Sequence, residues 1–286
     1  MKFVSFRTSA GCRVGVVTAP DRVAEIALDD PERGVLGLIE RRQPIVATGV
    51  THAYDDLVLT APIPRPVRNI MCVGKNYREH AAEFAASGYD SGASVTVPAF
   101  PIIFTKAPSA VADPGAVVTV SRAVTTQVDY EAEFAVIIGV GGRGIGRSAA
   151  MDHVWGYTLV NDLTARDLQR DHKQWFLGKS QDGFAPLGPW AVTRDEIDLA
   201  ELVLTCTVNG APRQSAPASD LIFDVPSLIE TISAGITLQP GDIIATGTPA
   251  GVGIGFDPPR FLEDGDVVEV TATGLGSLST TIRIED

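Results

Sequence analysis

Cysteine is scarce in this sequence and poorly placed for cross-linking. The chain has 286 residues and three cysteines, Cys12, Cys72 and Cys206, which lie far apart and form no C-x-x-C pair. A disulfide framework uses an even set of cysteines, and a zinc knuckle uses closely paired ones. The sequence therefore predicts neither kind of site.

The sequence also has no long apolar run and fewer basic than acidic residues. No run reaches the ~18 residues that cross a membrane, and Arg7 and Arg13 interrupt any apolar core of a signal peptide at the N-terminus. Lys and Arg number 23 against 35 Asp and Glu, a net charge of −12, which argues against binding nucleic acid or anionic membranes. We expect a soluble, cytoplasmic protein.

The chain is 45% hydrophobic, which is enough for a full-sized core. Pro62, Pro64 and Pro66 alternate with single residues in APIPRPVRN. Proline neither continues a helix nor pairs in a central strand, so this stretch is typical of a stiff connector. We place a boundary there, between a small N-terminal domain (1–65) and a catalytic domain (66–286).

Strand patterns outnumber helical ones, above all after residue 100. Asn209-Gly210 stands between two extended runs as a hairpin signal. Two short helices are predicted at LTARDLQRDHK and at VPSLIETISAG, with Asp224 as the cap of the second. Because the helices follow no regular βαβ repeat, the predicted class is α+β, mainly β, built on a rolled or sandwiched sheet.

The stretch VDYEAEFAVII (128–138) looks like a strand, yet it carries acids on its way into a core. Side chains two apart in a strand share a face, so Glu131 and Glu133 lie on the same side. One interpretation is a pair of oxygen ligands for Mg²⁺ or Mn²⁺, since a cation would offset their repulsion. The other, which is the commoner pattern, is an exposed polar face of a half-buried strand, with each Glu solvated or paired with Lys or Arg.

Asp162 is the candidate for a third acidic ligand. It ends the apolar run WGYTLVND, just before the predicted helix LTARDLQRDHK. Three carboxylates from two adjacent strands would suit Mg²⁺, which usually keeps several waters for a substrate to displace. Asp is equally suited to cap the helix that follows, and both interpretations stay open.

His80 and Glu83 lie three residues apart in NYREHAAEF, on one face of a predicted helix. They could form a catalytic dyad in which the histidine is the general base and the glutamate orients its ring. A solvent-exposed pair is the simpler interpretation. The position favours the dyad, because the Gly/Ser/Pro-rich stretch GYDSGASVTVPAFP (88–101) follows directly and is predicted to be a mobile loop.

The glycine-rich stretch from Gly139 to Gly144 matches G-x-G-x-x-G after a strand, which can indicate a dinucleotide site. The preceding strand carries two glutamates, which would repel a pyrophosphate, and SAAMDHV is too short for the crossover helix of that fold. We therefore interpret these glycines as a turn. Gly178-Lys179-Ser180 lacks the earlier glycine of a phosphate-binding loop and fails that pattern too.

Seven segments, taken in order, resemble the fumarylacetoacetate hydrolase family, in particular its shorter members. They are VGKNYREHAAE, FTKAPSA, DYEAEFAVIIG, GYTLVNDLTARDLQ, FLGKSQDGFAPLGPW, VNGAPRQSA and PGDIIATGTPAGVG. The resemblance implies a mixed β-roll catalytic domain, a small N-terminal domain, a homodimer and bound Mg²⁺ or Mn²⁺. It implies the following roles: metal ligands Glu131, Glu133 and Asp162; catalytic residues His80, Glu83 and Lys179; substrate contacts Arg166, Gln169 and Thr248.

One position departs from the namesake hydrolases, which carry a further acidic ligand where this chain has Val73. That departure puts the namesake substrate in doubt. The expected function is a metal-dependent hydrolase that cleaves a C–C bond of 2,4-dioxo acids such as acylpyruvates, through the enolate of a chelated 2-oxo acid. The alternative is an isomerase (tautomerase) or decarboxylase acting on 2-hydroxyhepta-2,4-diene-1,7-dioate or oxaloacetate, because the chemistry up to the enolate is shared.

Overall fold

The computed structural model describes residues 1–41, 45–89 and 97–286. Its largest element is a sheet with the strand order β4 (Ala47–Ala53), β3 (Arg22–Ile26), β2 (Gly11–Ala19), β1 (Lys2–Thr8), β14 (Ala185–Thr193), β12 (Val154–Asn161), β11 (Ala132–Ile138), β17 (Ile243–Ala245), β6 (Ile70–Gly74) and β7 (Ile102–Lys106); β5 (Val58–Thr60) pairs with β1 and β8 (Val111–Ala112) with β14. The expected mainly β fold is therefore confirmed.

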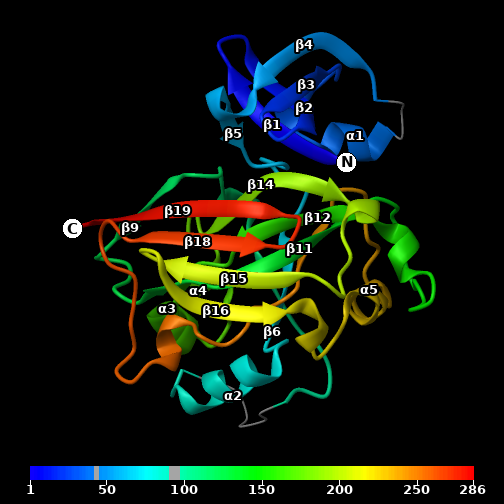
Figure 1. Ribbon diagram of the computed structural model, residues 1–286. Helices are drawn as coiled ribbons and strands as arrows, with labels where there is room; N and C mark the ends of the chain where they lie inside the picture. The colour runs from blue at the N-terminus through cyan, green and yellow to red at the C-terminus, as the bar shows by residue number, and fades with distance from the viewer. Residues whose placement is uncertain (42–44, 90–96) are drawn as a thin grey trace.

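A second sheet packs in front of the large one (Figure 1). Its strands are β16 (Ala211–Pro217), β15 (Val203–Val208), β18 (Val267–Ala272), β19 (Gly276–Glu285) and β9 (Val117–Ser121). A two-stranded ribbon joins β10 (Val128–Asp129) to β13 (Thr164–Ala165). Side chains from β11, β12, β15 and β18 meet between the sheets and form the main core, with Phe134, Leu159, Leu204 and Val270 among them.

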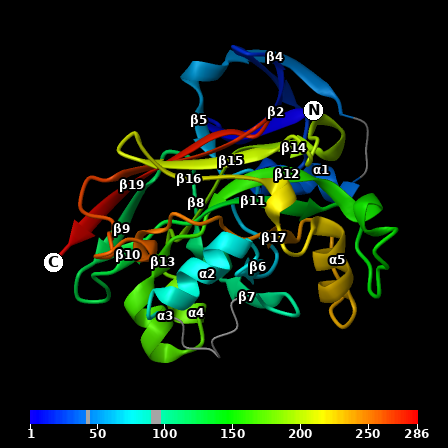
Figure 2. The same ribbon diagram turned by 60° about the horizontal axis from the view of Figure 1, so that its bottom comes forward.

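The α-helices of the described residues are short and lie outside the two sheets. They are α1 (Leu36–Arg41), α2 (Arg78–Ala86), α3 (Arg166–His172), α4 (Phe176–Lys179) and α5 (Val225–Ser233). Figure 2 shows α2, α3 and α4 gathered at one end of the molecule, near β6 and β7. None of the described helices is long and apolar enough to span a membrane.

Strand β11 is buried on both faces, which explains its nearly continuous apolar sequence. Phe134 and Val136 face the core between the sheets. Ala135 and Ile137 face the opposite side, where Leu36 of α1 covers them. Acids in this strand therefore sit in the interior of the fold rather than on a wet surface.

Local turn signals agree with the structure. Asn209 and Gly210 have φ values of 52° and 75° between β15 and β16, as a tight hairpin requires. Asp224 accepts a hydrogen bond from the Ser227 N–H and caps α5. The glycine-rich stretch after β11 opens no α-helix, and a Cβ on Gly141 would lie 2.7 Å from the Leu238 oxygen. Close packing therefore accounts for that glycine.

The division of the chain at residue 65 stays a prediction. The N-terminal strands form a distinct group in Figure 1. However, β1 pairs with β14 through Lys2–Val192 and Phe3–Ala191, so one sheet runs across the boundary.

We predict that Gly156→Ala in β12 destabilises the protein. A Cβ there would overlap the carbonyl oxygen of Val192, a backbone atom of β14 that cannot move without disturbing the strand pairing. The expected loss is about 3 kcal/mol, the upper end of what overpacking costs, measured by urea unfolding. Gly146→Ala is the control, because nothing lies within 4 Å of a Cβ there; it should change stability by less than about 0.5 kcal/mol. Equal stability of the two variants would contradict the prediction.

Candidate metal centre and active site

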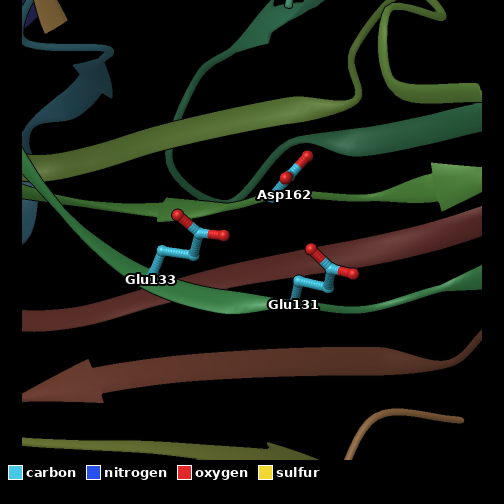
Figure 3. Close-up of side chains that lie close together, drawn as sticks. All are labelled: Glu131, Glu133 and Asp162. Carbon is cyan, nitrogen blue, oxygen red and sulfur yellow. The ribbon is translucent and has the colours of Figure 1, made fainter. Parts of the chain in front are cut away.

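The register of β11 and β12 brings the three predicted acids together. The strands are antiparallel, with Ala132 opposite Asn161, and the Asp162 N–H donates to the Glu131 oxygen at 2.8 Å. Asp162 therefore lies across from Glu131, while Glu133 lies one side-chain repeat further along β11. Ligand oxygens of the three residues lie within 4.8 Å of one another, and Figure 3 shows the carboxylates grouped on one side of the strands.

Both simpler interpretations of these acids are wrong. Glu131 is 5% exposed, Glu133 1% and Asp162 0%, so they do not form an exposed polar face. Asp162 does not cap a helix either, because α3 begins at Arg166 and Ala165 occupies its cap position.

Buried cations surround the acids. The Lys179 ammonium donates to Glu131 at 2.7 Å and to Asp162 at 2.8 Å. Lys106 donates to Asp162 at 2.5 Å and to the Leu163 oxygen at 3.0 Å. These contacts balance much of the negative charge on Glu131 and Asp162.

Arg166 adds a further positive charge beside the acids. Its guanidinium lies 2.8 Å from Glu131 and 2.8 Å from Asp129, and all three residues are buried. Arg166 thus ties Glu131 to Asp129 of β10.

The acids differ in their proton affinity. Burial alone would raise the pKa of Glu131, but Lys179 and Arg166 outweigh it and lower the pKa to about 2. Burial raises the pKa of Glu133 well above its usual range, and the charges of Asp162 and Glu131 raise it further. Glu133 is therefore the least compensated acid, although one of its oxygens accepts from the Gly247 N–H at 2.7 Å.

These residues fit a divalent cation. All three ligands are carboxylates, the oxygen donors that hard cations such as Mg²⁺ and Mn²⁺ prefer. A cation beside Glu133 would also remove the repulsion that now favours its protonated form.

The predicted dyad is assembled beside the acids. His80 Nδ1 lies 3.1 Å from Glu83 Oε2 on α2, and His80 is only 4% exposed, so the solvent-exposed interpretation is wrong. The other Glu83 oxygen accepts from the Gly251 N–H at 2.9 Å. Glu83 thus links the helix to the loop before the 3₁₀ turn η7 (Gly253–Gly255).

One cleft is lined by seven of the nine predicted site residues; Asp162 and Glu83 lie behind or beside it and are not part of its lining. It encloses about 280 Å³, counted with its mouth. Its polar lining includes His80, Glu131, Glu133, Arg166, Gln169, Lys179 and Thr248.

The three predicted substrate contacts are engaged within the protein. Arg166 donates to Gln169 Oε1 at 3.1 Å. Thr248 accepts from Gln214 at 2.7 Å. Their roles toward a substrate, like those of the dyad and Lys179, stay predictions.

Sequence reasoning missed three residues of this region. Lys106 lies in the family-like segment FTKAPSA but was given no role. Asp129 stands in the acidic strand but was given no role; it accepts from the Gly253 N–H at 2.6 Å and the Ile254 N–H at 3.1 Å. Trp175, just before α4, forms part of the cleft wall. Half of the predicted mobile loop (88–101), residues 90–96, lies outside the described residues.

Fold and site together define a class: a mainly β enzyme with a buried carboxylate centre that can hold a metal. A sequence profile of the family described as "Fumarylacetoacetate (FAA) hydrolase C-terminal" matches residues 69–283. The chain belongs to the fumarylacetoacetate hydrolase family.

Individual relatives refine this assignment. Oxaloacetate tautomerase YisK of Bacillus subtilis (strain 168) is 50% identical over 232 residues, which cover 81% of this chain and 75% of the relative. A solved fumarylacetoacetate hydrolase from Exiguobacterium antarcticum has a TM-score of 0.86 at 38% identity, covering 100% of both chains. A 2-hydroxyhepta-2,4-diene-1,7-dioate isomerase from Mycobacterium marinum has a TM-score of 0.80 at 33% identity, covering 100% of this chain and 99% of the other.

We predict that metal binding releases a proton from Glu133. Its raised pKa favours the protonated form in the metal-free protein, whereas a cation requires the carboxylate. Glu131, with a pKa of about 2, is ionised throughout and adds no such dependence. Mn²⁺ affinity should therefore rise with pH, by up to about tenfold per unit below the pKa of Glu133, as measured by calorimetry in buffers of different ionisation enthalpy.

Glu133→Gln should lower Mn²⁺ affinity at least about tenfold and remove its pH dependence. Glu201→Gln, at an exposed site, is the matched control. If the affinity of the unmodified protein is the same at pH 6 and pH 8, Glu133 is not the residue that gives up the proton.

Proposed function

We propose that the protein is a divalent-metal-dependent tautomerase (isomerase) that interconverts the enol and keto forms of 2-oxo acids, with oxaloacetate as the first substrate to test. The observation that carries this proposal is the buried cluster of Glu131, Glu133 and Asp162 beside Lys179 and the His80–Glu83 pair. The tautomerase relative and the isomerase structure support it.

The acids would hold Mg²⁺ or Mn²⁺, which when bound supplies Lewis-acid polarisation of a 2-oxo group. Lys179 brings a second positive charge to the same place, because its ammonium contacts both Glu131 and Asp162. Positive charge fixed in advance, in a site closed to water, favours negative charge that develops on the 2-oxo oxygen as C3 loses a proton.

His80 is the residue placed to move that proton. The Glu83 carboxylate accepts from Nδ1–H, so Nε2 is left as the basic nitrogen of the neutral ring. His80 lines the cleft, so Nε2 can take a proton from one atom of the substrate and return it to another. Such a transfer changes no oxidation state and consumes no water.

Hydrolysis of acylpyruvates is the second candidate. The same His80–Glu83 geometry could activate a water molecule toward a distal carbonyl. The solved structure from Exiguobacterium antarcticum is named a hydrolase, but the 50% identical protein is named a tautomerase and another solved neighbour an isomerase, which together favour the isomerase. The predicted homodimer stays a prediction, which light scattering on the purified protein can test.

We predict that His80→Gln slows enol–keto conversion of oxaloacetate by about 10²–10⁴-fold, the range for loss of a general acid–base group. Mn²⁺ affinity should stay within about threefold, since His80 is not among the acidic ligands. Decay of enol absorbance is the readout, and Glu79→Gln, exposed on the same helix, is the control. Faster release of pyruvate from an acylpyruvate than conversion of oxaloacetate would favour the hydrolase instead.

We also predict that Gly255→Ala lowers this activity by displacing Glu83. A Cβ at Gly255 would overlap the Glu83 carboxylate, although Gly255 itself lies outside the cleft lining. The loss should match that of Glu83→Gln, and the double variant should be no worse than either single one. Gly235→Ala, with open space around its Cβ, is the control. Additive losses would show that Gly255 acts by another route.

A further inference from the structure

The cleft has a polar floor and an aromatic wall. The acids at the floor are at most 5% exposed. Trp175 is half-buried and also lines the cleft, so it is more exposed than the acids. The tail of a 2-oxo acid whose carboxylate end reaches the acids would extend toward this more exposed part of the lining.

Three neighbours hold the Trp175 ring in place. Its centroid lies 6.0 Å from that of Phe84 on α2 and 5.1 Å from that of Phe104 on β7, both in edge-to-face arrangements. On a third side it covers Gly74, where a Cβ would lie 2.5 Å from the indole. The glycine lets the ring come this close, and the two aromatic rings restrict its rotation.

The wall joins elements that are far apart in sequence. Phe84 lies on the same helix as His80, and Phe104 lies under Lys179, whose ammonium is 4.9 Å from the ring centroid. Trp175 therefore bridges the helix that carries the dyad and the strand beside the acids. A substrate tail that displaced Trp175 would disturb both sides of the site.

The small volume of the cleft also limits the length of a substrate. Its 280 Å³, which includes open solvent at the mouth, is an upper limit and still falls below the ~300–1,000 Å³ typical of ligand pockets. A metal ion, its waters and the 2-oxo carboxylate end would fill much of that space.

We infer that Trp175 is a specificity-determining residue, which limits the substrates to short 2-oxo acids by closing the cleft beyond the first few carbons. The inference rests on the proposed function for the orientation of the 2-oxo acid. It adds a substrate class to that function: short 2-oxo acids would bind, whereas seven-carbon dienes and aromatic 2-oxo acids would clash with the Trp175 indole.

Binding to the Mn²⁺-loaded protein tests this without reference to turnover. Calorimetry compares 2-oxobutyrate with phenylpyruvate, which share the 2-oxo acid end and differ in the tail. The unmodified protein should bind 2-oxobutyrate at least about tenfold more tightly. Trp175→Ala should lower the dissociation constant of phenylpyruvate at least about tenfold, which is the lower end of what a pocket wall contributes to discrimination. It should leave the dissociation constant of 2-oxobutyrate within about threefold of that of the unmodified protein.

Two further variants test whether Trp175 acts as a wall of the cleft or only supports the structure in general. Trp175→Phe keeps part of the ring and should give an intermediate ratio of the two dissociation constants. Phe176→Ala, at the exposed neighbouring position, should leave the ratio unchanged. Thermal unfolding by circular dichroism confirms that each variant is folded.

The outcomes are distinct. Equal affinity of the unmodified protein for the two acids, or equal weakening of both by Trp175→Ala, overturns the inference about Trp175. Size-selective binding without enol–keto conversion leaves this inference standing and overturns the proposed tautomerase. A protein that binds neither acid overturns both.

Discussion

The structure depends on a cluster of like charges in its interior. Two carboxylates within 4.8 Å of one another repel by roughly 3–4 kcal/mol at an effective dielectric constant near 20. The fold sets this repulsion because the register of β11 and β12 places Asp162 across from Glu131. Lys179, Lys106 and Arg166 compensate two of the acids, and Glu133 is left with a raised pKa. A divalent cation bound by the three acids would offset this remaining repulsion.

The loop around Gly251 couples the acid cluster to the dyad. On one side, Asp129 accepts from two amides of η7 while it pairs with Arg166, which in turn holds Glu131. On the other side, Glu83 accepts from the Gly251 N–H while it orients His80. His80 and Glu131 are thus both tied, through Glu83 and Arg166, to a shared piece of backbone. Movement of α2 away from this loop would break the hydrogen bond between Glu83 and the Gly251 N–H.

The sequence revealed those parts of the site that a local pattern encodes. Glu131 and Glu133 stand out because a core strand rarely carries acids, and His80 and Glu83 share a helix face. Whether Asp162 was a cap or a ligand depended on the register with β11, which no local pattern carries. Lys106 at the end of β7 and Trp175 just before α4 become part of the site only through tertiary packing, Lys106 by its contact with Asp162 and Trp175 by its contacts with Phe84 and Phe104. Their roles arise from tertiary contacts, so composition and periodicity could not show them.

The choice between tautomerase and hydrolase could not be read from the sequence for a related reason. Both proposed reactions share the enolate that the acids and Lys179 would stabilise. In tautomerisation the enolate forms when C3 loses a proton, whereas in hydrolysis it forms when the bond between C3 and the water-attacked carbonyl breaks. Hydrolysis needs room for a water beside a distal carbonyl, whereas tautomerisation needs that water kept out. Phe84, Phe104 and Trp175 form an apolar wall of the cleft. Their side chains carry no group that would hold a water for hydrolysis apart from the indole N–H, which agrees with the proposed tautomerase.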